Sequence, residues 1–105
     1  MTDIPKFHQF MRPLLEVLQE RGELPRNEAI EAVVQKVGLT DEQMAVSQES
    51  NGKSLARGRI SWASSYLRVA GALTGPKRGY FALGPNASAL LALGRPITRA
   101  DLTGV

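Results

Sequence analysis

A few residues have the types that catalysis needs, but their spacing does not suit a catalytic centre. Gly52-Lys53-Ser54 resembles the end of a phosphate-binding P-loop. That motif requires another glycine five positions before Gly52, where Ser47 stands, and a strand in front of it. Metal-dependent nucleases often carry an acidic residue two positions before a lysine, and none of the four lysines has one.

The composition narrows the chemistry further, because cysteine is absent and His8 is the only histidine. A disulfide framework, a thiol nucleophile and a zinc site built from Cys or His are therefore excluded. We expect neither catalysis nor a metal or cofactor in this chain.

Arginines and serines at helical spacing over residues 55–70 are better suited to binding than to catalysis. At 100° per residue, one side of this helix is apolar and the other carries only cations and hydroxyls. An ordinary solvated face has charges of both signs, so the lack of carboxylates favours contact with DNA. Arginine binds phosphate or guanine, and serine reaches phosphates and bases. The predicted DNA-binding side chains on this face are Arg57, Ser61, Ser64, Ser65 and Arg68.

The opposite side of this helix contains Ile60, Leu67 and Val69 together with two aromatic residues. We expect Trp62 and Tyr66 to lie in the core rather than to act as stacking platforms. Arg59 also falls on this side, so it either pairs with an acidic residue of the preceding long helix or holds a phosphate at the helix start. DNA binding by this helix requires guanidinium groups that share one surface and do not fold back onto the glutamates of the first half.

Acidic and basic residues are unevenly distributed along the whole chain, and the change occurs just before the helix at residues 55–70. Residues 1–52 contain nine acidic and five basic residues, whereas residues 53–100 contain eight basic residues and no acidic one. A segment without carboxylates attracts polyanions, of which nucleic acid is the commonest in the cytosol. The charge pattern therefore predicts nucleic acid or another polyanion as a partner, and the helix face described above makes double-stranded DNA the expected one.

Periodicity and capping residues predict the elements that position these side chains. The first helix follows Pro5, is kinked or split at Pro13 and ends at Gly22. Three more helices are predicted from their capping residues. Residues 26–37 are followed by Gly38 as a C-terminal cap, and a Thr/Gln capping box starts a short helix from Thr40 to about Val46. The fourth helix, residues 55–70, lies between Ser54 as N-cap and Gly71.

The second half of the chain predicts a small hairpin and one more helix. Strands at 72–74 and 80–83 flank a turn that contains Lys77 and Arg78, and a last helix runs from Pro85 to about Leu93. This order predicts a mainly α (α+β) winged helix-turn-helix, in which helices precede a small β-hairpin wing and a C-terminal helix. Its last core helix would enter the major groove, while the wing contacts the DNA backbone or the minor groove.

The remaining site residues and the extent of the domain follow from this arrangement. Lys77 and Arg78 would form the wing contact, and Lys53 and Arg59 would hold phosphates. Residues 1–94 are expected to form the winged-helix domain and residues 95–105 a tail or a linker to a catalytic domain. Without a membrane-spanning stretch or a signal peptide, we expect a cytoplasmic protein with no membrane partner.

Five segments of the chain resemble the N-terminal domain of the Mrr restriction-system proteins. They are IPKFHQFMRPLLEVL, EAIEAVV, GLTDEQ, RISWASSYLRVAGAL and RGYFAL, and the resemblance as a whole covers about Ile4 to Leu93. The most specific part is Arg59-Ile60-Ser61-Trp62-Ala63 with Tyr66-Leu67 and Ala70-Gly71. The resemblance implies a winged-helix DNA-binding module that precedes a nuclease domain in a type IV restriction endonuclease, which cleaves methylated DNA. The nuclease residues of that family have no counterpart here.

Two other functions stay open on the sequence alone. A stand-alone transcription regulator would form a homodimer and bind a palindrome. A protein-interaction winged helix would place its Arg/Ser face against an acidic protein surface, and salt-sensitive DNA binding would then be absent.

Overall fold

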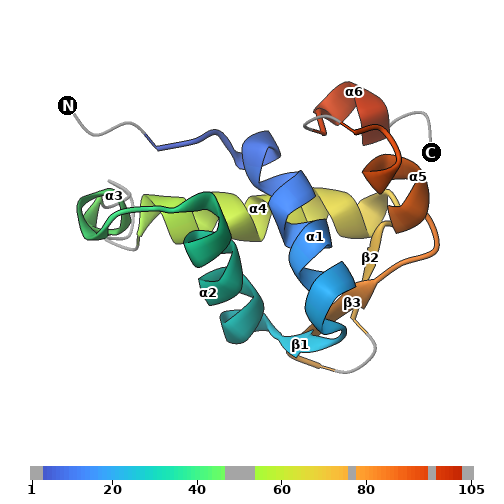
Figure 1. The fold of residues 1–105 in the computed structure, drawn as a ribbon, viewed down its shortest axis with the longest axis horizontal. Coiled ribbons are helices and arrows are strands. Elements are labelled where there is room, and N and C mark those ends of the chain that lie inside the picture. Colours follow the sequence, from blue (N-terminus) through green and yellow to red (C-terminus); the bar gives the residue numbers. More distant parts are fainter. Residues whose placement is uncertain (1–3, 47–53, 76–77, 95–96, 103–105) are drawn as a thin grey trace.

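The computed structural model describes residues 4–46, 54–75, 78–94 and 97–102. Figure 1 shows α1 (Met11–Arg21) crossing in front of α4 (Leu55–Val69), with α2 (Arg26–Val37) beside them. The short helix α3 (Asp41–Ala45) lies near the start of α4, and the strands β1 (Leu24–Pro25) and β3 (Tyr80–Leu83) lie below α1 in this view. The predicted mainly helical α+β class is confirmed, and the order of elements is winged-helix-like.

The first predicted helix is split in two by the chemistry of Pro13. A 3-10 helix, η1 (Phe7–Phe10), precedes α1, so Pro13 is the third residue of α1. The first N–H groups of an α-helix have no intrahelical acceptor, and the N–H that proline lacks is therefore not missed there. Gly22 ends α1 with a φ of 80°, and its N–H donates to the Leu18 carbonyl over 2.8 Å.

The predicted boundaries of α2 and the cap of α3 are confirmed. Gly38 follows α2 in the left-handed conformation, and the N–H of Leu39 donates back to the Val34 carbonyl over 3.0 Å. In the capping box, the Gln43 N–H donates to Thr40 Oγ1 over 3.1 Å. The Thr40 N–H donates to Gln43 Oε1 over 2.8 Å, which closes the box.

Three short strands form an antiparallel sheet in the order β1-β3-β2. The hairpin of β2 (Leu73–Thr74) and β3 (Tyr80–Leu83) agrees with the prediction to within one residue. The strand β1 (Leu24–Pro25) was not predicted, and it pairs Leu24 with Phe81. Pro25 is tolerated because β1 is an edge strand. The Arg26 N–H donates to the Gly79 carbonyl over 2.8 Å, which joins the start of α2 to the wing turn.

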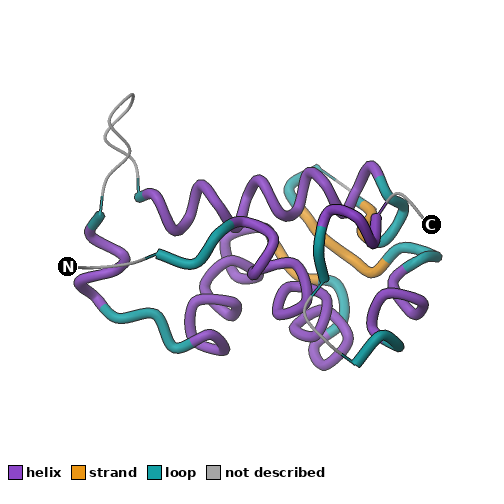
Figure 2. The backbone as a smooth tube through the Cα atoms, turned by 90° about the horizontal axis from the view of Figure 1, so that it is seen from above, coloured by secondary structure: helices purple, strands orange, loops and turns teal. Residues whose placement is uncertain are grey.

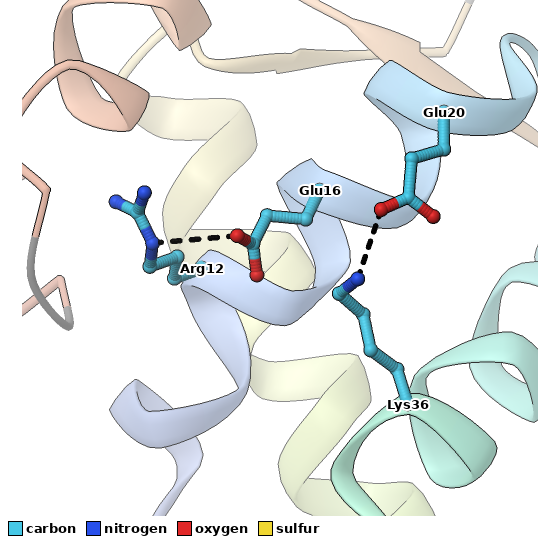
Figure 3. Close-up of polar contacts among 4 residues, drawn as sticks. All are labelled: Arg12, Glu16, Glu20 and Lys36. Atoms are coloured by element: carbon cyan, nitrogen blue, oxygen red, sulfur yellow. Dashed lines mark hydrogen bonds and ion pairs between the residues drawn. The ribbon is translucent and has the colours of Figure 1, made fainter.

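One hydrophobic core joins the helices to the sheet. Each of α1, α2 and α4 contributes one apolar side to it, and β3 contributes Phe81. Its fully buried side chains include Phe10, Leu14, Leu15, Val33, Ile60 and Leu67. The ion pairs of α1 lie outside this core: Lys36 Nζ of α2 is 2.9 Å from Glu20 Oε1 of α1, and Arg12 pairs with Glu16 within α1 (Figure 3).

The C-terminal part of the chain differs from prediction in detail. The prediction that Pro85 starts the last helix is wrong, because a turn at 85–86 precedes α5 (Ala87–Leu91). Ile97 is fully buried, and a short helix α6 (Arg99–Leu102) follows it, neither of which the sequence indicated. The division of the chain after residue 94 stays a prediction.

Among the described residues, no helix combines the length and the apolar character that crossing a bilayer requires.

Candidate nucleic-acid interface

The helix α4 runs along one side of the molecule, and α1 and α2 pack against it from the other side (Figure 2). Ser54 caps its N-terminus as predicted, since Ser54 Oγ accepts the Arg57 N–H over 3.4 Å. Its side chains Ala56, Ile60, Ala63 and Leu67 are buried in the core. The outer face of α4, defined here as its exposed residues together with the half-exposed Ser61 between them, consists of Arg57, Ser61, Trp62, Ser65, Arg68 and Val69.

Two apolar residues of the outer face were assigned to the wrong side. Trp62 is 61% exposed and Val69 is 91% exposed, so the prediction that Trp62 lies in the core is wrong. With Ile60 at 0°, the buried residues occupy an arc from about 300° to about 40°, whereas Trp62 and Val69 lie at about 200° and 180°. The arc of α4 that the sequence predicted to be buried was too wide at Trp62 and Val69, because hydrophobicity alone does not show how far the neighbouring helices cover a helix.

The same shift of the buried arc removes Ser64 from the predicted DNA-binding face. Ser64 lies at about 40°, is only 4% exposed, and donates from Oγ to the Ser61 carbonyl over 2.6 Å. The hydroxyl satisfies its hydrogen bond within the helix, which makes its burial inexpensive. Ser65 is exposed as predicted, and its Oγ donates to the same carbonyl over 3.3 Å.

The two exposed arginines of α4 have different surroundings. Arg57 forms an ion pair with Glu31 of α2, so one guanidinium does fold onto a glutamate of the first half. Arg68 points toward the wing, and its Nη2 lies 3.5 Å from where a Cβ on Gly75 would stand. Both side chains share the outer face, at about 60° and 80° around the helix.

Arg59 is held by the backbone near the N-terminus. Its Nη1 donates to the carbonyls of Ile4 over 2.7 Å and Pro5 over 3.0 Å. The internal partner of Arg59 is thus a pair of carbonyls, and the expectation of an acidic partner from α2 is wrong. A guanidinium used in this way ties the segment before η1 to α4, and it is half-buried rather than free on the surface.

The structure describes one of the two predicted wing cations. Arg78 is exposed in the turn before β3. Lys77 and Lys53, which were also predicted to contact DNA, lie outside the described residues.

Arg26 is a cation of this surface that sequence reasoning missed. It is the first residue of α2, and its guanidinium donates to Ser61 Oγ on the outer face of α4. With Arg57 and Ser61 it lines a cleft of about 670 Å³ between α2 and α4. The available signal was a basic residue directly after Pro25, at the start of a helix that comes before α4 in the chain. The structure therefore brings Arg26 of α2 beside Arg57 and Arg68 of α4, and the backbone of Arg26 contacts the turn that contains Arg78.

A second cavity, of about 350 Å³, lies beside the outer face and is lined mainly by apolar groups. Phe7 stacks on Tyr66 with ring centroids 4.9 Å apart, and Trp62 lies 6.2 Å from Tyr66. Tyr66 is half-buried against the core, in agreement with its predicted side. Three aromatic rings thus extend from η1 to the edge of the outer face.

Among the described residues, no three His, Cys, Asp or Glu side chains gather in a way that could hold a metal ion.

Comparison with known proteins identifies the family of the chain. Residues 7–92 match the family model described as the Mrr N-terminal domain. No curated protein and no solved structure matches the chain. Mrr N-terminal domains belong to restriction-system proteins. Because the match covers most of the 105 residues and includes the elements that form the surface just described, this chain belongs to the Mrr N-terminal domain family.

Proposed function

We propose that this chain is the DNA-binding module of an Mrr-like restriction endonuclease that targets methylated double-stranded DNA. Helix α4 lies in the major groove, and the wing turn at residues 75–79 contacts the DNA backbone. The observation that carries the proposal is that Arg57 and Arg68 share the outer face of α4 and that Arg26 joins them by donating to Ser61, while Arg78 is exposed in the neighbouring wing turn. Arginine pairs bidentately with phosphate or with guanine, so this surface suits a nucleic acid.

The roles of individual residues follow from where they lie. Ser61 and Ser65 are short enough to let the backbone of α4 approach the bases, and their hydroxyls hydrogen-bond to bases or phosphates. Arg26 and Arg78 bind phosphates on either side of the groove. Arg59 acts indirectly by fixing the segment at Ile4 and Pro5 against α4. Lys53 and Lys77 are proposed phosphate contacts on the sequence argument alone.

The salt dependence of binding tests this function. If each of the four arginines neutralises one phosphate, the plot of log K against log salt has a slope of about −3.6, from about −0.9 per phosphate. Affinity for duplex DNA should then fall about 150-fold between about 50 and about 200 mM salt. Fluorescence anisotropy with a labelled random-sequence duplex measures this. An affinity that does not change with salt would contradict the proposal and favour the protein-interaction function.

The ion pair between Arg57 and Glu31 leads to a second expectation. To reach a phosphate, the Arg57 guanidinium must leave the Glu31 carboxylate, which is itself about half exposed and repels DNA. Such exposed pairs contribute little, so Glu31→Gln should raise DNA affinity only about two- to fivefold. Glu28→Gln is the matched control, since it removes the same charge from an exposed position one turn earlier on α2. Equal affinities of the two variants would show that Glu31 does not compete with DNA for Arg57.

A further inference from the structure

The most exposed large apolar side chains of the described residues lie together on α4. Val69 and Trp62 are 91% and 61% exposed, whereas the next two, Leu93 and Val37, reach 41% and 37%. A separation of seven residues places Trp62 and Val69 on the same side of the helix, about 10.5 Å apart along its axis. Exposed apolar groups that gather in this way mark contact sites more often than scattered ones do.

This apolar stripe, Trp62 and Val69, adjoins the cations of the same outer face. Ser65 lies between the two sets at about 140°, whereas Arg57, Arg68 and Ser61 lie between about 60° and 100°. The arginines and the apolar stripe thus lie toward opposite edges of the exposed arc, so a major groove that receives this face contacts both. The arginines of this face favour a negatively charged partner. We therefore infer that the face binds nucleic acid rather than an apolar helix of another protein.

We propose that Trp62 and Val69 contact the C5-methyl groups of pyrimidines in the major groove, an inference that rests on the proposed function. Among the unmodified bases, the C5-methyl group of thymine is the apolar feature that base edges present in that groove, and apolar side chains read it. Thymine carries this methyl group, and so does cytosine methylated at C5. Base pairs are spaced by about 3.4 Å along the DNA axis, so side chains about 10.5 Å apart reach methyl groups at most about three base pairs apart.

The surroundings of Trp62 hold its indole ready for this contact. Its ring is 6.2 Å from that of Tyr66, with the two planes at 37°, and Tyr66 in turn stacks on Phe7. The aromatic series is connected to the core through Tyr66, which restricts the orientation of Trp62 while leaving its outer side exposed. Less rotamer freedom is then lost when the ring meets a methyl group.

Two pairs of random-sequence duplex pools test the inference with the full chain at constant low salt. The first pair compares thymine with deoxyuridine, which lacks only the C5-methyl group, and the second compares cytosine with 5-methylcytosine. We expect wild-type affinity to be about fourfold higher for each methyl group contacted. A response in the first pair alone assigns the contact to thymine, a response in the second pair alone assigns it to methylated cytosine, and either supports the proposal.

Variants connect the methyl preference to the two side chains. Trp62→Ala and Val69→Ala should each reduce the preference while leaving the salt dependence of binding unchanged. Val37→Ala is the matched control, because it shortens an exposed valine at the end of α2 and should keep the preference. Thermal unfolding of each variant verifies that the fold is retained.

Each outcome decides a different point. Equal wild-type affinity within both pairs of pools overturns the inference, and so does a methyl preference that survives in both alanine variants. These results leave the proposed function intact as long as salt-sensitive binding is seen. If the wild type binds none of the pools, the proposed function fails and the inference fails with it.

Discussion

Replacing Arg57 and Arg68 by glutamine in one variant should weaken binding to duplex DNA about 100-fold at low salt. Each guanidinium that meets a phosphate forms a charge-assisted hydrogen bond, and two such bonds at the low end of their range, about 1.5 kcal/mol each, correspond to a loss of this size. The slope of log K against log salt should become less steep by about 1.8, because two fewer counterions are released. Glutamine is preferred to glutamate here because a second carboxylate beside Glu31 would disturb the fold by repulsion.

A control with the same change in net charge distinguishes local contact from global attraction. Arg12 and Lys36 are cations of α1 and α2 that pair with Glu16 and Glu20 (Figure 3). The double variant Arg12→Gln, Lys36→Gln should keep a salt slope close to that of the wild type. If both double variants lose affinity equally, the outer face of α4 is not the DNA-binding surface, and only the overall charge of the protein attracts DNA.

Gly84→Ala should lower the free energy of unfolding by about 3 kcal/mol, the upper end for inserting a methyl group into a packed site. A Cβ at residue 84 would lie 2.3 Å from the Gly71 carbonyl oxygen and 2.9 Å from its carbonyl carbon. Both atoms belong to the backbone, so no side chain can move aside. The two segments are also joined by hydrogen bonds from Gly84 N–H to Ala72 and from Asn86 N–H to Gly71.

Chemical denaturation monitored by circular dichroism measures this loss. Gly75→Ala serves as the control, because the nearest atoms to its added Cβ are 3.5 Å away, an ordinary contact distance. At such a site alanine should be neutral or stabilising, by about 0.4–1 kcal/mol. Similar stabilities for the two variants would mean that β3 and the end of α4 move apart with little loss of stability. The wing would then not be rigidly connected to α4.

The elements with strong local signals were predictable from the sequence. Helix α2 has periodic valines and a glycine directly after it, and its predicted bounds agree with the structure. The capping box at Thr40 and Gln43 and the strand at residues 80–83 are local signals of the same kind. Each depends on residues within a few positions of one another, so the chain needs no distant partner to specify it.

Several features that escaped prediction depend on distant partners. β1 has two residues and exists because β3 lies beside it, and Ile97 belongs to the core that α1, α2 and α4 form. The guanidinium of Arg57 meets Glu31, and that of Arg26 meets Ser61, although 26 and 35 residues separate the partners. No periodicity within a helix contains this information.

The sequence by itself determined that residues 55–70 form an amphipathic helix, that its polar side carries cations and hydroxyls without carboxylates, and that a basic turn follows it. Only the tertiary structure decided which part of that helix is covered. The packing of α1 and α2 placed Ser64 inside and left Trp62 and Val69 in solvent. The reason is geometric: the repeat of a helix specifies the angles between its side chains, whereas the positions of neighbouring helices specify which of those angles are buried.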